Sequence, residues 1–345
     1  MKPYISGHKI RVGGEVSEAW RQLFSPVECS NCLGEGELWD EYDDLVNCPK
    51  CDSDGIIESN QMTFRFSTSI QNFADRVKLK HDEYIWSFNK SLFDPTAFIG
   101  LYHEGDWLRA IIHRGPKLFF WCGGDILRLQ KKPFWQWLIR QVEADHVCEN
   151  EVEWHALKNM GIHSRIHPIL FFDDWEKYPL SYTAPVTNAH VWLTCHPGRE
   201  REYGVELVEE IADLVPEVNF HIFGIAKSFH DTWFDPIDGE MHNYRQSSQP
   251  NIYYHGQVPS EKLDKMIRGY HAGLRTCEFD GCPHTVTKGV LLGQWPINRI
   301  PYPHTDSYET KEELIKLLKG LKNKKKPNLV GRKHWLKTVS EFPWQ

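Results

Sequence analysis

The sequence predicts an α/β protein with two Rossmann-like domains and a small zinc-binding insertion near the amino terminus. Three observations support this prediction. Apolar strand patterns alternate with amphipathic helix patterns twice along the chain, which indicates parallel sheets. Loops containing glycine or proline follow several strands directly, at the edge where such sheets bind ligands. Four cysteines form two CxxC pairs within residues 27–58.

Size and charge limit the possible classes of protein. With 345 residues, of which 41% are hydrophobic, the chain can bury two domain cores. The net charge of −7 is unevenly spread, because residues 314–340 carry nine Lys/Arg and no carboxylate, whereas residues 28–58 carry ten carboxylates and one lysine. There is no apolar run of about 18 residues and no signal-peptide pattern, so we expect a soluble, cytoplasmic protein without a membrane span.

The clustered cysteines predict a structural zinc site. Cys29 and Cys32 form one CxxC pair, and Cys48 and Cys51 form the other, fifteen residues further on. This type and spacing match a closed four-thiolate site, in which zinc has no open catalytic position. Two disulfides are the alternative, disfavoured because nothing indicates secretion. The acidic charge of residues 28–58 argues against this module holding DNA.

In the amino-terminal domain, residues 1–168, several elements alternate. Residues 8–24 fit a strand, the Gly13-Gly14 turn and a helix, although a hairpin is equally compatible. Further strands are predicted at 63–67, 97–102, 117–121 and 145–149, and helices at 132–145 and 152–160. The third of these strands ends in the loop Cys122-Gly123-Gly124-Asp125. This order predicts a parallel sheet with ligand-binding loops after its strands.

A second alternation begins near Ile169 and predicts the carboxyl-terminal domain, residues 169–325. Its strands are predicted at 191–195, 219–224, 252–255 and 274–277, and its helices at 205–214 and 261–270. Ser260 is the expected N-cap of the latter helix, and residues 225–249 fit a polar loop. Residues 326–345 are predicted to form a basic helix that can pack back on the amino-terminal domain.

Residues 278–296 contain the most informative loop. Gly281 permits a sharp turn, Pro283 presets the first helical φ angle, Thr285 can cap the helix, and Gly293 ends it. The unpaired amides and the dipole at such a helix start favour an anion. The segment therefore predicts an anion site at the end of the strand at 274–277.

The same segment resembles the donor-sugar motif of retaining glycosyltransferases with the GT-B fold, similar to glycosyltransferase family 4. In that motif an acidic residue, a glycine, an apolar residue and a proline precede the helix. The loop after the strand at 117–121, with Gly123, Gly124 and Asp125, resembles a second loop of the family. The resemblance covers most of residues 95–340 and is best over 190–300. It implies two domains facing across a cleft and transfer of a sugar, with retention, from a nucleotide-sugar to an acceptor hydroxyl.

The resemblance also implies a donor site. Arg199 is the candidate for holding the diphosphate and Arg201 the alternate, while Tyr203 stands at the position of the usual lysine. Gly281 and the amides of His284 and Thr285 belong to the anion loop, and Gly123 and Gly124 to the opposite domain. Aligned on Gly281, the first acidic position is Asp280, with Glu278 two residues early. The second, eight positions on, is Lys288, which cannot accept ribose hydrogen bonds but could meet a phosphate.

The candidates for chemistry are three. Asp280 is expected to contact the donor sugar, and Asp125 to face the donor or the acceptor. His103 follows a strand and could act as an acid–base group, although a surface-loop histidine is the plainer interpretation. No Asp-x-Asp pair with a metal-site context occurs, so we expect no catalytic divalent metal. The family implies no separate protein base, because the leaving phosphate takes the acceptor proton.

Several functions stay open at this stage. The basic segment Lys316–Lys337 is compatible with DNA containing hydroxymethylated bases, as in some phages, as the acceptor, although a solvated helix is the simpler explanation of the lysines. A saccharide, a lipid-linked or a small-molecule acceptor is equally compatible. Lys288 favours a non-catalytic GT-B-like binding protein instead. A third alternative gives the zinc module the main role, in an adaptor whose acidic face binds a basic partner.

Overall fold

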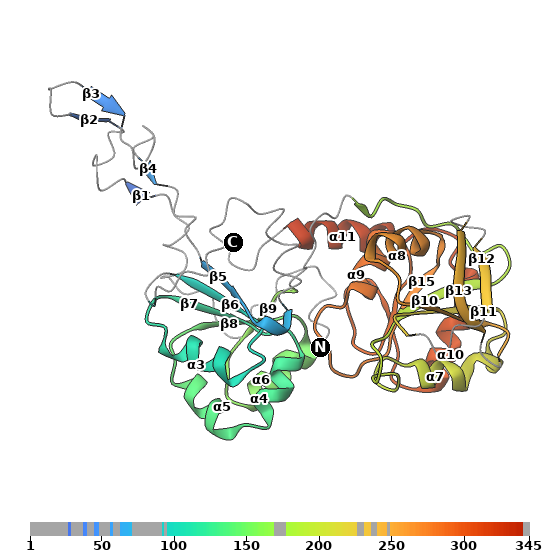
Figure 1. Ribbon diagram of the computed structural model, residues 1–345, viewed down its shortest axis with the longest axis horizontal. Helices are drawn as coiled ribbons and strands as arrows, with labels where there is room; N and C mark the ends of the chain where they lie inside the picture. Colours follow the sequence, from blue (N-terminus) through green and yellow to red (C-terminus); the bar gives the residue numbers. More distant parts are fainter. Residues whose placement is uncertain are drawn as a thin grey trace. The chain divides into compact units, whose positions relative to one another are not determined.

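A computed structural model describes residues 63–70, 92, 95–168, 177–225 and 249–340, together with backbone strands at 27–28, 37–39, 45–47, 56–57, 231–235 and 240–246 (Figure 1). Two compact units result. The amino-terminal unit holds Arg11–Glu149 and Trp154–His167, and the carboxyl-terminal unit holds Asn150–Glu153 and Pro168–Phe342. Each unit is built around its own sheet.

The amino-terminal unit contains a five-stranded sheet in which every neighbouring pair is parallel. The strands lie side by side in chain order: β5 (Thr63–Phe66), β6 (Thr96–Ile99), β7 (Lys117–Phe120), β8 (Asp145–Cys148) and β9 (Arg165–Ile166). Its helices are α3 (Glu104–Ile112), α4 (Gly124–Gln130), α5 (Pro133–Arg140) and the part of α6 (Glu151–Asn159) from Trp154 on. The predicted parallel α/β architecture is confirmed for this unit.

Burial explains why these segments become central strands. All four residues of β6 and all four of β7 are buried, including Phe119 and Phe120. A strand that is buried on both faces needs a continuous apolar run rather than an alternating one. The sequences Thr-Ala-Phe-Ile and Lys-Leu-Phe-Phe meet that need, and the Lys117 ammonium at the start of β7 donates to the His113 carbonyl (2.6 Å).

The carboxyl-terminal unit contains an eight-stranded sheet with the order β12-β13-β14-β11-β10-β15-β16-β17. The strands are β10 (Ala189–Thr194), β11 (Val218–Phe223), β12 (Asp231–Asp235), β13 (Glu240–Gln246), β14 (Ile252–Gly256), β15 (Ala272–Arg275), β16 (Ile297–Asn298) and β17 (Asp306–Ser307). Its six parallel strands run third, second, first, fourth, fifth and sixth in chain order. This is the order of a Rossmann sheet, and it reverses direction between β10 and β15.

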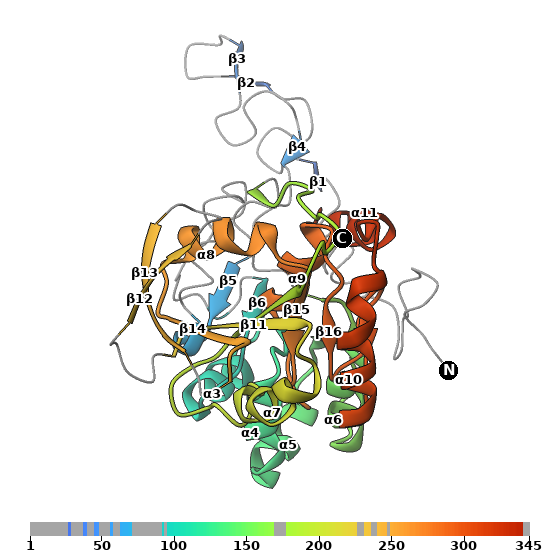
Figure 2. The same ribbon diagram turned by 90° about the vertical axis from the view of Figure 1, so that its right-hand side faces the viewer.

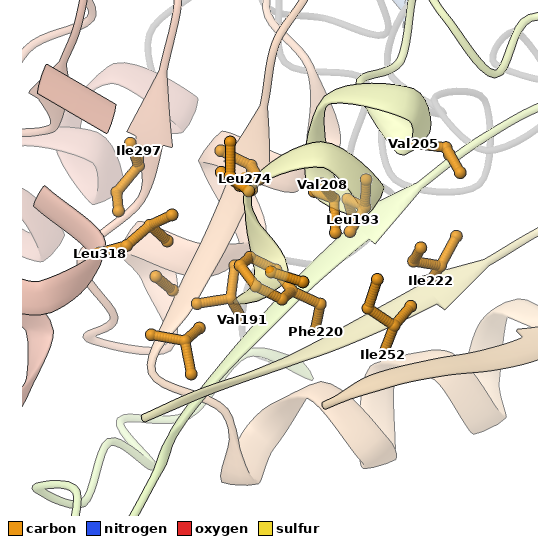
Figure 3. Packing of buried hydrophobic residues seen from close by; sticks show 14 of the residues in the cluster. Val191, Leu193, Val205, Val208, Phe220, Ile222, Ile252, Leu274, Ile297 and Leu318 are labelled. Carbon is orange, nitrogen blue, oxygen red and sulfur yellow. The ribbon is translucent and has the colours of Figure 1, made fainter. Parts of the chain in front are cut away.

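Helices cover both faces of this sheet (Figures 1 and 2). On one face, Val191, Leu193 and Phe220 pack against α7 (Val205–Ile211) and α10 (Lys311–Gly320), as Figure 3 shows for Val208 and Leu318. On the other face, Trp192 and Phe223 pack against α8 (Ser260–Met266), α9 (His284–Leu291) and α11 (Leu329–Ser340). The alternation of side chains along β10 and β11 sends neighbouring residues into opposite layers.

The structure corrects two local predictions. Residues 225–249 were expected to form a polar loop, but β12 and β13 pair antiparallel within them, and β13 continues the sheet beside β14. The Asp238-Gly239 pair is typical of a hairpin turn and could have revealed this. Ser260 is the first helical residue of α8 rather than its cap, because extended Pro259 takes the N-cap position.

The described part of the carboxyl-terminal basic helix belongs to the carboxyl-terminal unit. In α11 the Arg332 guanidinium donates to the Tyr178 carbonyl (2.7 Å), and the Trp335 indole donates to the Pro303 carbonyl (3.0 Å). Trp335 is buried against the layer formed by α9. These contacts attach α11 to the carboxyl-terminal sheet.

Candidate functional site

The reversal of strand order between β10 and β15 locates the candidate site. Neighbouring loops leave such a point in opposite directions, which opens a crevice at the carboxyl ends of the two strands. The loop Cys195–Arg199 follows β10, and the loop Thr276–Gly281 follows β15. Both loops are ones in which the sequence placed donor-binding residues, so the topology brings Arg199 and Gly281 to one sheet edge.

Arg199 lies in the first of these loops and is half exposed, at 49% of its side chain. Its Nε donates to Glu202 Oε2 (2.7 Å), and its Nη1 donates to the Tyr203 hydroxyl (3.1 Å). The hydrogen bond that Arg199 donates to the Glu202 carboxylate raises the pKa of Arg199. The guanidinium is thus held in place but still faces solvent, whereas Arg201, the alternate candidate, is simply exposed.

Arg275 is a functional candidate that the sequence analysis missed. It ends β15 with only 11% of its side chain exposed, and its Nε and Nη2 approach Asp280 Oδ2 at 2.6 and 2.5 Å. Burial alone would lower the pKa of Arg275, but the charge of Asp280, those of Cys277 and Tyr203 and the hydrogen bond to Asp280 together outweigh burial, so the pKa is raised. A charged residue closing an otherwise apolar strand, five positions before an aspartate, was the available signal.

The ring of Tyr203 joins the two arginines. The guanidinium carbon of Arg275 lies 4.2 Å from the ring centroid and that of Arg199 lies 4.8 Å from it. Aromatic rings attract cations at these distances. Tyr203, at the position where the family resemblance expected a lysine, therefore keeps two fixed positive charges close to one another at the β10–β15 edge.

The start of α9 lies at the same edge. Pro283 is the N-cap in extended conformation, and the amides of Val286 and Thr287 both donate to its carbonyl. Thr285 is consequently inside the helix and is not the cap that we predicted, and no side-chain cap bond is present at Pro283. The Thr285 hydroxyl instead lies 3.4 Å from that of Thr194, the last residue of β10.

Close packing explains the glycines around this helix. A Cβ on Gly273 of β15 would lie 2.5 Å from the Thr285 carbonyl oxygen, and one on Gly204 would lie 2.3 Å from Thr276 Oγ1. Gly204 also has a φ of +82°, which favours glycine. The helices after β10 and β15 can therefore approach the strand ends closely.

The two acidic candidates of this loop differ in availability. Asp280 is engaged by Arg275, and its other oxygen accepts the Gly281 amide (3.1 Å). Glu278 is 84% exposed and stands 3.9 Å from the Arg299 guanidinium. It lines a cavity of about 530 Å³ together with Arg299, Glu309 and Thr310. Of the two carboxylates, Glu278 is the one open to a ligand.

Lys288 is directed into the protein. Its side chain is 6% exposed, its ammonium donates to Asp264 Oδ1 (2.6 Å) on α8, and it lies 5.4 Å from the centre of the Tyr178 ring. The Tyr178 hydroxyl donates to the other oxygen of Asp264 (2.9 Å). This buried pair fastens α9 to α8, which accounts for a lysine at this position without a phosphate.

The cysteines near the crevice are unsuited to nucleophilic chemistry. Burial raises the pKa of Cys195 and that of Cys277 to about 11, so both thiols stay protonated at neutral pH. Cys282 is buried, with its sulfur 3.5 Å from the Thr287 hydroxyl. The chemistry of this edge therefore rests on charge and hydrogen bonding.

In the amino-terminal unit, Asp125 is fully buried. Its oxygens accept the amides of Leu101 (2.9 Å), Cys122 (3.0 Å) and Ile126 (2.9 Å). Burial raises the pKa of Asp125 to about 6, against the effect of these amides. The structure thus places this carboxylate inside the β6 and β7 loops, which it ties together. Gly123, with φ +87°, and Gly124 make the turn into α4.

His103 lies at the exposed start of α3. Its Nε2 is 2.8 Å from the Ser69 hydroxyl, its Nδ1 is 3.4 Å from Arg128 Nη1, and its amide donates to Asp106. Asp106 also accepts from the Ser67 hydroxyl (2.7 Å). His103 is thus the N-cap residue of α3 within a polar network at the carboxyl edge of this sheet.

The zinc prediction concerns Cys29, Cys32, Cys48 and Cys51, which lie outside the described residues. The backbone around them is described at four short strands, where Val27–Glu28 pairs with Ile56–Ile57 and Glu37–Trp39 pairs with Leu45–Asn47. Among the described residues no cluster of three or more His, Cys, Asp or Glu side chains could hold a metal. In the same part of the chain, no helix is long and apolar enough to cross a membrane.

Comparisons with known proteins give weak likenesses. No family model matches the chain, and no curated protein matches its sequence. Among solved structures it is similar to Anabaena HepE in complex with UDP and glucose, at 11% identity over 72% of this chain and 74% of that one (TM-score 0.48). Sucrose-phosphate synthase from Thermosynechococcus elongatus shows 11% identity over 90% and 82% (0.49). WaaG, a glycosyltransferase involved in lipopolysaccharide biosynthesis, shows 8% over 82% and 96% (0.44).

Proposed function

We propose that this protein is a glycosyltransferase of the GT-B type that binds a nucleotide-sugar at the β10–β15 crevice and transfers the sugar to an acceptor hydroxyl. One observation supports this most. The strand-order reversal of a Rossmann sheet coincides with two adjacent arginines, Arg199 and Arg275, and with the amino terminus of α9. An anionic, nucleotide-bearing ligand is the chemistry that such an edge favours.

The donor diphosphate is assigned to the arginines and to α9. Its negative charge grows as the bond to the sugar breaks, and fixed positive groups stabilise that charge without having to reorganise. Arg199 supplies an exposed guanidinium, and the first-turn amides of His284 and Thr285 supply oriented donors. Arg275 is buried, so it adds positive potential and holds Asp280 in place.

The donor sugar is assigned to Glu278. Its open carboxylate can accept hydrogen bonds from sugar hydroxyls, whereas Asp280 is already engaged by Arg275. Counted from Glu278, the position eight residues on is Val286, which is fully buried. Neither Val286 nor Lys288 can accept ribose hydroxyls, so we infer that the ribose is held by backbone or by other side chains.

The proposed reaction proceeds with retention and needs no protein base. The bond between the anomeric carbon and the diphosphate oxygen breaks, the acceptor oxygen forms the new bond on the same face, and its proton passes to the leaving phosphate. Asp125 cannot reach substrate from its buried position, and we assign it to loop structure. His103, exposed in its network, is a candidate for orienting the acceptor.

Nucleotide binding tests this proposal directly. Titration with UDP, GDP and ADP should give saturable binding of at least one of them, weakened roughly 10- to 100-fold in Arg199→Ala by loss of a charge-assisted bond. Arg201→Ala, which removes the neighbouring exposed arginine and alternate candidate, should bind normally, and a loss of affinity there instead would assign the diphosphate to Arg201. Equal affinity in Arg199→Ala and wild type would show that the donor site is misplaced.

Turnover separates the enzyme from the alternative of a non-catalytic GT-B-like binding protein. Products should be sought by mass spectrometry after incubation with mixed nucleotide-sugars and with acceptors of three kinds: DNA containing hydroxymethylated bases, saccharides, and lipid-linked or small-molecule hydroxyls. Glu278→Gln should lower turnover while leaving UDP affinity unchanged. Nucleotide binding with neither a transfer product nor hydrolysis of the donor would favour the binding protein.

The four cysteines are proposed to hold one structural zinc ion. Each CxxC pair directly follows a short strand, Val27–Glu28 for the first and Leu45–Asn47 for the second. Metal analysis of the purified chain should find about one zinc per molecule. Two disulfides, the alternative, would leave no zinc and no free thiol at these positions in the non-reduced protein.

A further inference from the structure

The segment from the end of α10 to the middle of α11 presents an unusual surface. We call it the basic face, and it consists of Lys322, Lys325, Lys326, Leu329, Val330 and Lys333. All six side chains are exposed, including 55% of Leu329 and 68% of Val330. Large apolar side chains so exposed, next to one another and flanked by lysines, call for an explanation beyond solubility.

The backbone beneath this face is firmly held. The carbonyl of Lys326 accepts the Trp295 indole N–H (3.0 Å), and the amide of Asn328 donates to the Gly293 carbonyl (2.8 Å). The Asn328 side chain bonds the His304 carbonyl (2.8 Å) and the Gly331 amide (3.0 Å). The polar groups on the inner side of this loop are hydrogen-bonded to the rest of the unit. This fixes the backbone so that the lysines and the two apolar side chains stay exposed.

Helix geometry places the outer residues of α11 together. At about 100° per residue, Leu329, Val330 and Lys333 fall within one arc of about 100°. The opposite arc carries Gly331 and Trp335, which are buried. The helix is therefore already packed by its apolar side, and the exposed arc is an additional surface at its first turn.

The charge of this face is uncompensated. Lys322, Lys325, Lys326 and Lys333 form no ion pair with any residue that the structure describes, unlike Lys324, which pairs with Asp306 (2.9 Å). Residues 314–340 contain no carboxylate at all, although the chain as a whole has a net charge of −7. A local positive field on an acidic protein complements an anionic partner.

We propose that the basic face docks on an anionic lipid surface, with Leu329 and Val330 entering the headgroup region and the four lysines meeting lipid phosphates. Lysines that surround a small exposed apolar pair fit an interface with both anionic and apolar parts. Nucleic acid would use the lysines but would leave Leu329 and Val330 against water or phosphate. The inference stands apart from the proposed function, although it favours an acceptor presented at a membrane.

Vesicle co-sedimentation of the full chain tests this docking. We expect binding to phosphatidylcholine vesicles containing about one third phosphatidylglycerol, weak binding to pure phosphatidylcholine, and a loss of binding as salt rises. Lys325→Gln/Lys326→Gln should weaken binding roughly 25-fold, and Leu329→Gln/Val330→Gln about tenfold. Lys131→Gln/Lys158→Gln, two exposed lysines of the amino-terminal unit, should bind as wild type.

Three outcomes overturn the proposal. One is the absence of binding to anionic vesicles, and another is binding that Leu329→Gln/Val330→Gln leaves unchanged. The third is a DNA gel shift that Lys325→Gln/Lys326→Gln abolishes while vesicles are not bound, which would assign the face to nucleic acid. UDP titration of the same variants keeps the tests separate, because donor affinity should be unaffected in all of them.

Discussion

The two units show how different residues use the same sheet edge. In the carboxyl-terminal unit the loop after β10 and the end of β15 each hold an arginine against the ring of Tyr203, beside the start of α9. In the amino-terminal unit the loops after β6 and β7 are joined by a buried carboxylate, Asp125, that accepts three backbone amides. One edge presents positive charge, and the other turns its charge inward.

Strand order adds to this difference. The described strands of the amino-terminal sheet follow one another in chain order, whereas the carboxyl-terminal sheet reverses between β10 and β15. A reversal opens a crevice, and only residue types suited to an anion turn that crevice into a donor site. A parallel α/β architecture is therefore necessary for the proposed site, but the positions of Arg199 and Arg275 specify it.

The largest expected effect is on the buried pair of the carboxyl-terminal edge. Arg275→Met should lower the free energy of unfolding by about 3 kcal/mol, because it leaves Asp280 without its partner, and should weaken UDP binding by at least tenfold. Arg275→Met/Asp280→Leu should recover most of the stability but none of the affinity. Urea denaturation and calorimetric titration measure the two effects separately.

The amino-terminal edge supplies the matched comparison. Asp125→Asn should destabilise its own unit by about 1–3 kcal/mol, since amides that now bond a carboxylate lose an acceptor. Its UDP affinity should stay within about twofold of wild type if the amino-terminal loops lie outside the diphosphate site. A strong loss of affinity in Asp125→Asn would break the comparison between the two edges.

A pH titration should distinguish the units next. Four histidines form a hydrogen-bonded row across the carboxyl-terminal sheet, with His190 Nδ1 and His221 Nε2 2.9 Å apart and His221 Nδ1 and His255 Nε2 also 2.9 Å apart. The His190 amide donates to His271 Nδ1 (2.8 Å). Burial lowers the pKa of His190 and His221, and that of His271 to about 4.

The sign follows from the lowered pKa values. Between about pH 6.5 and 4 these histidines bind protons in the unfolded chain but not in the folded one. The carboxyl-terminal unit therefore loses stability as pH falls, by about 3 kcal/mol for His271 alone. In the amino-terminal unit, burial raises the pKa of Asp125 and lowers that of His146. As pH falls, the first shift adds to the free energy of unfolding and the second subtracts from it, so the two effects oppose each other. Hydrogen exchange of peptides from each unit should show the steeper pH dependence in the carboxyl-terminal one.

A variant isolates the contribution of one ring. His271→Asn keeps an acceptor near the His190 amide, but the asparagine side chain cannot titrate. The pH dependence of the free energy of unfolding of the carboxyl-terminal unit should therefore weaken by the equivalent of about one proton. An unchanged slope in His271→Asn, or an equal slope in both units, would refute the assignment of acid sensitivity to this row.

Glycine substitutions at the candidate edge should have smaller and graded effects. Gly224 and Gly198 both have positive φ, at +93° and +79°, but a Cβ on Gly224 would lie 2.1 Å from the Cys195 carbonyl oxygen, whereas one on Gly198 meets nothing within 4 Å. Gly198→Ala should cost about 1 kcal/mol from backbone strain alone, and Gly224→Ala more than 2 kcal/mol. Thermal denaturation of the two variants measures the difference, and equal costs would contradict close packing at Cys195.

The zinc module should have the smallest effect on the comparison. Cys29→Ser/Cys48→Ser should abolish zinc content, because two of four thiolates are lost. UDP affinity and the stability of both sheets should change little, since the module is separate in sequence from either edge. Zinc analysis beside calorimetric titration tests this, and a parallel loss of UDP binding would make the module part of the donor site.

The sequence alone determined the local features of this protein. Alternating apolar and amphipathic segments predicted the parallel architecture of both sheets, and the Gly281–Pro283 turn predicted a helix that begins at His284 in the structure. These features depend on neighbours within a few residues, where turn chemistry and periodicity act. The hairpin at 231–246 was missed because the Asp-Gly turn was counted as part of a polar loop.

The tertiary structure alone decided which side chains are available. Lys288 and Asp125 are polar residues beside suggestive motifs, yet each is engaged by partners distant in sequence, Asp264 for one and the Leu101 amide for the other. The Arg275 guanidinium packs on the ring of Tyr203, which lies 72 positions earlier in the chain. Ion pairs and burial depend on contacts between strands and helices, and the order of those strands is not encoded in any local pattern.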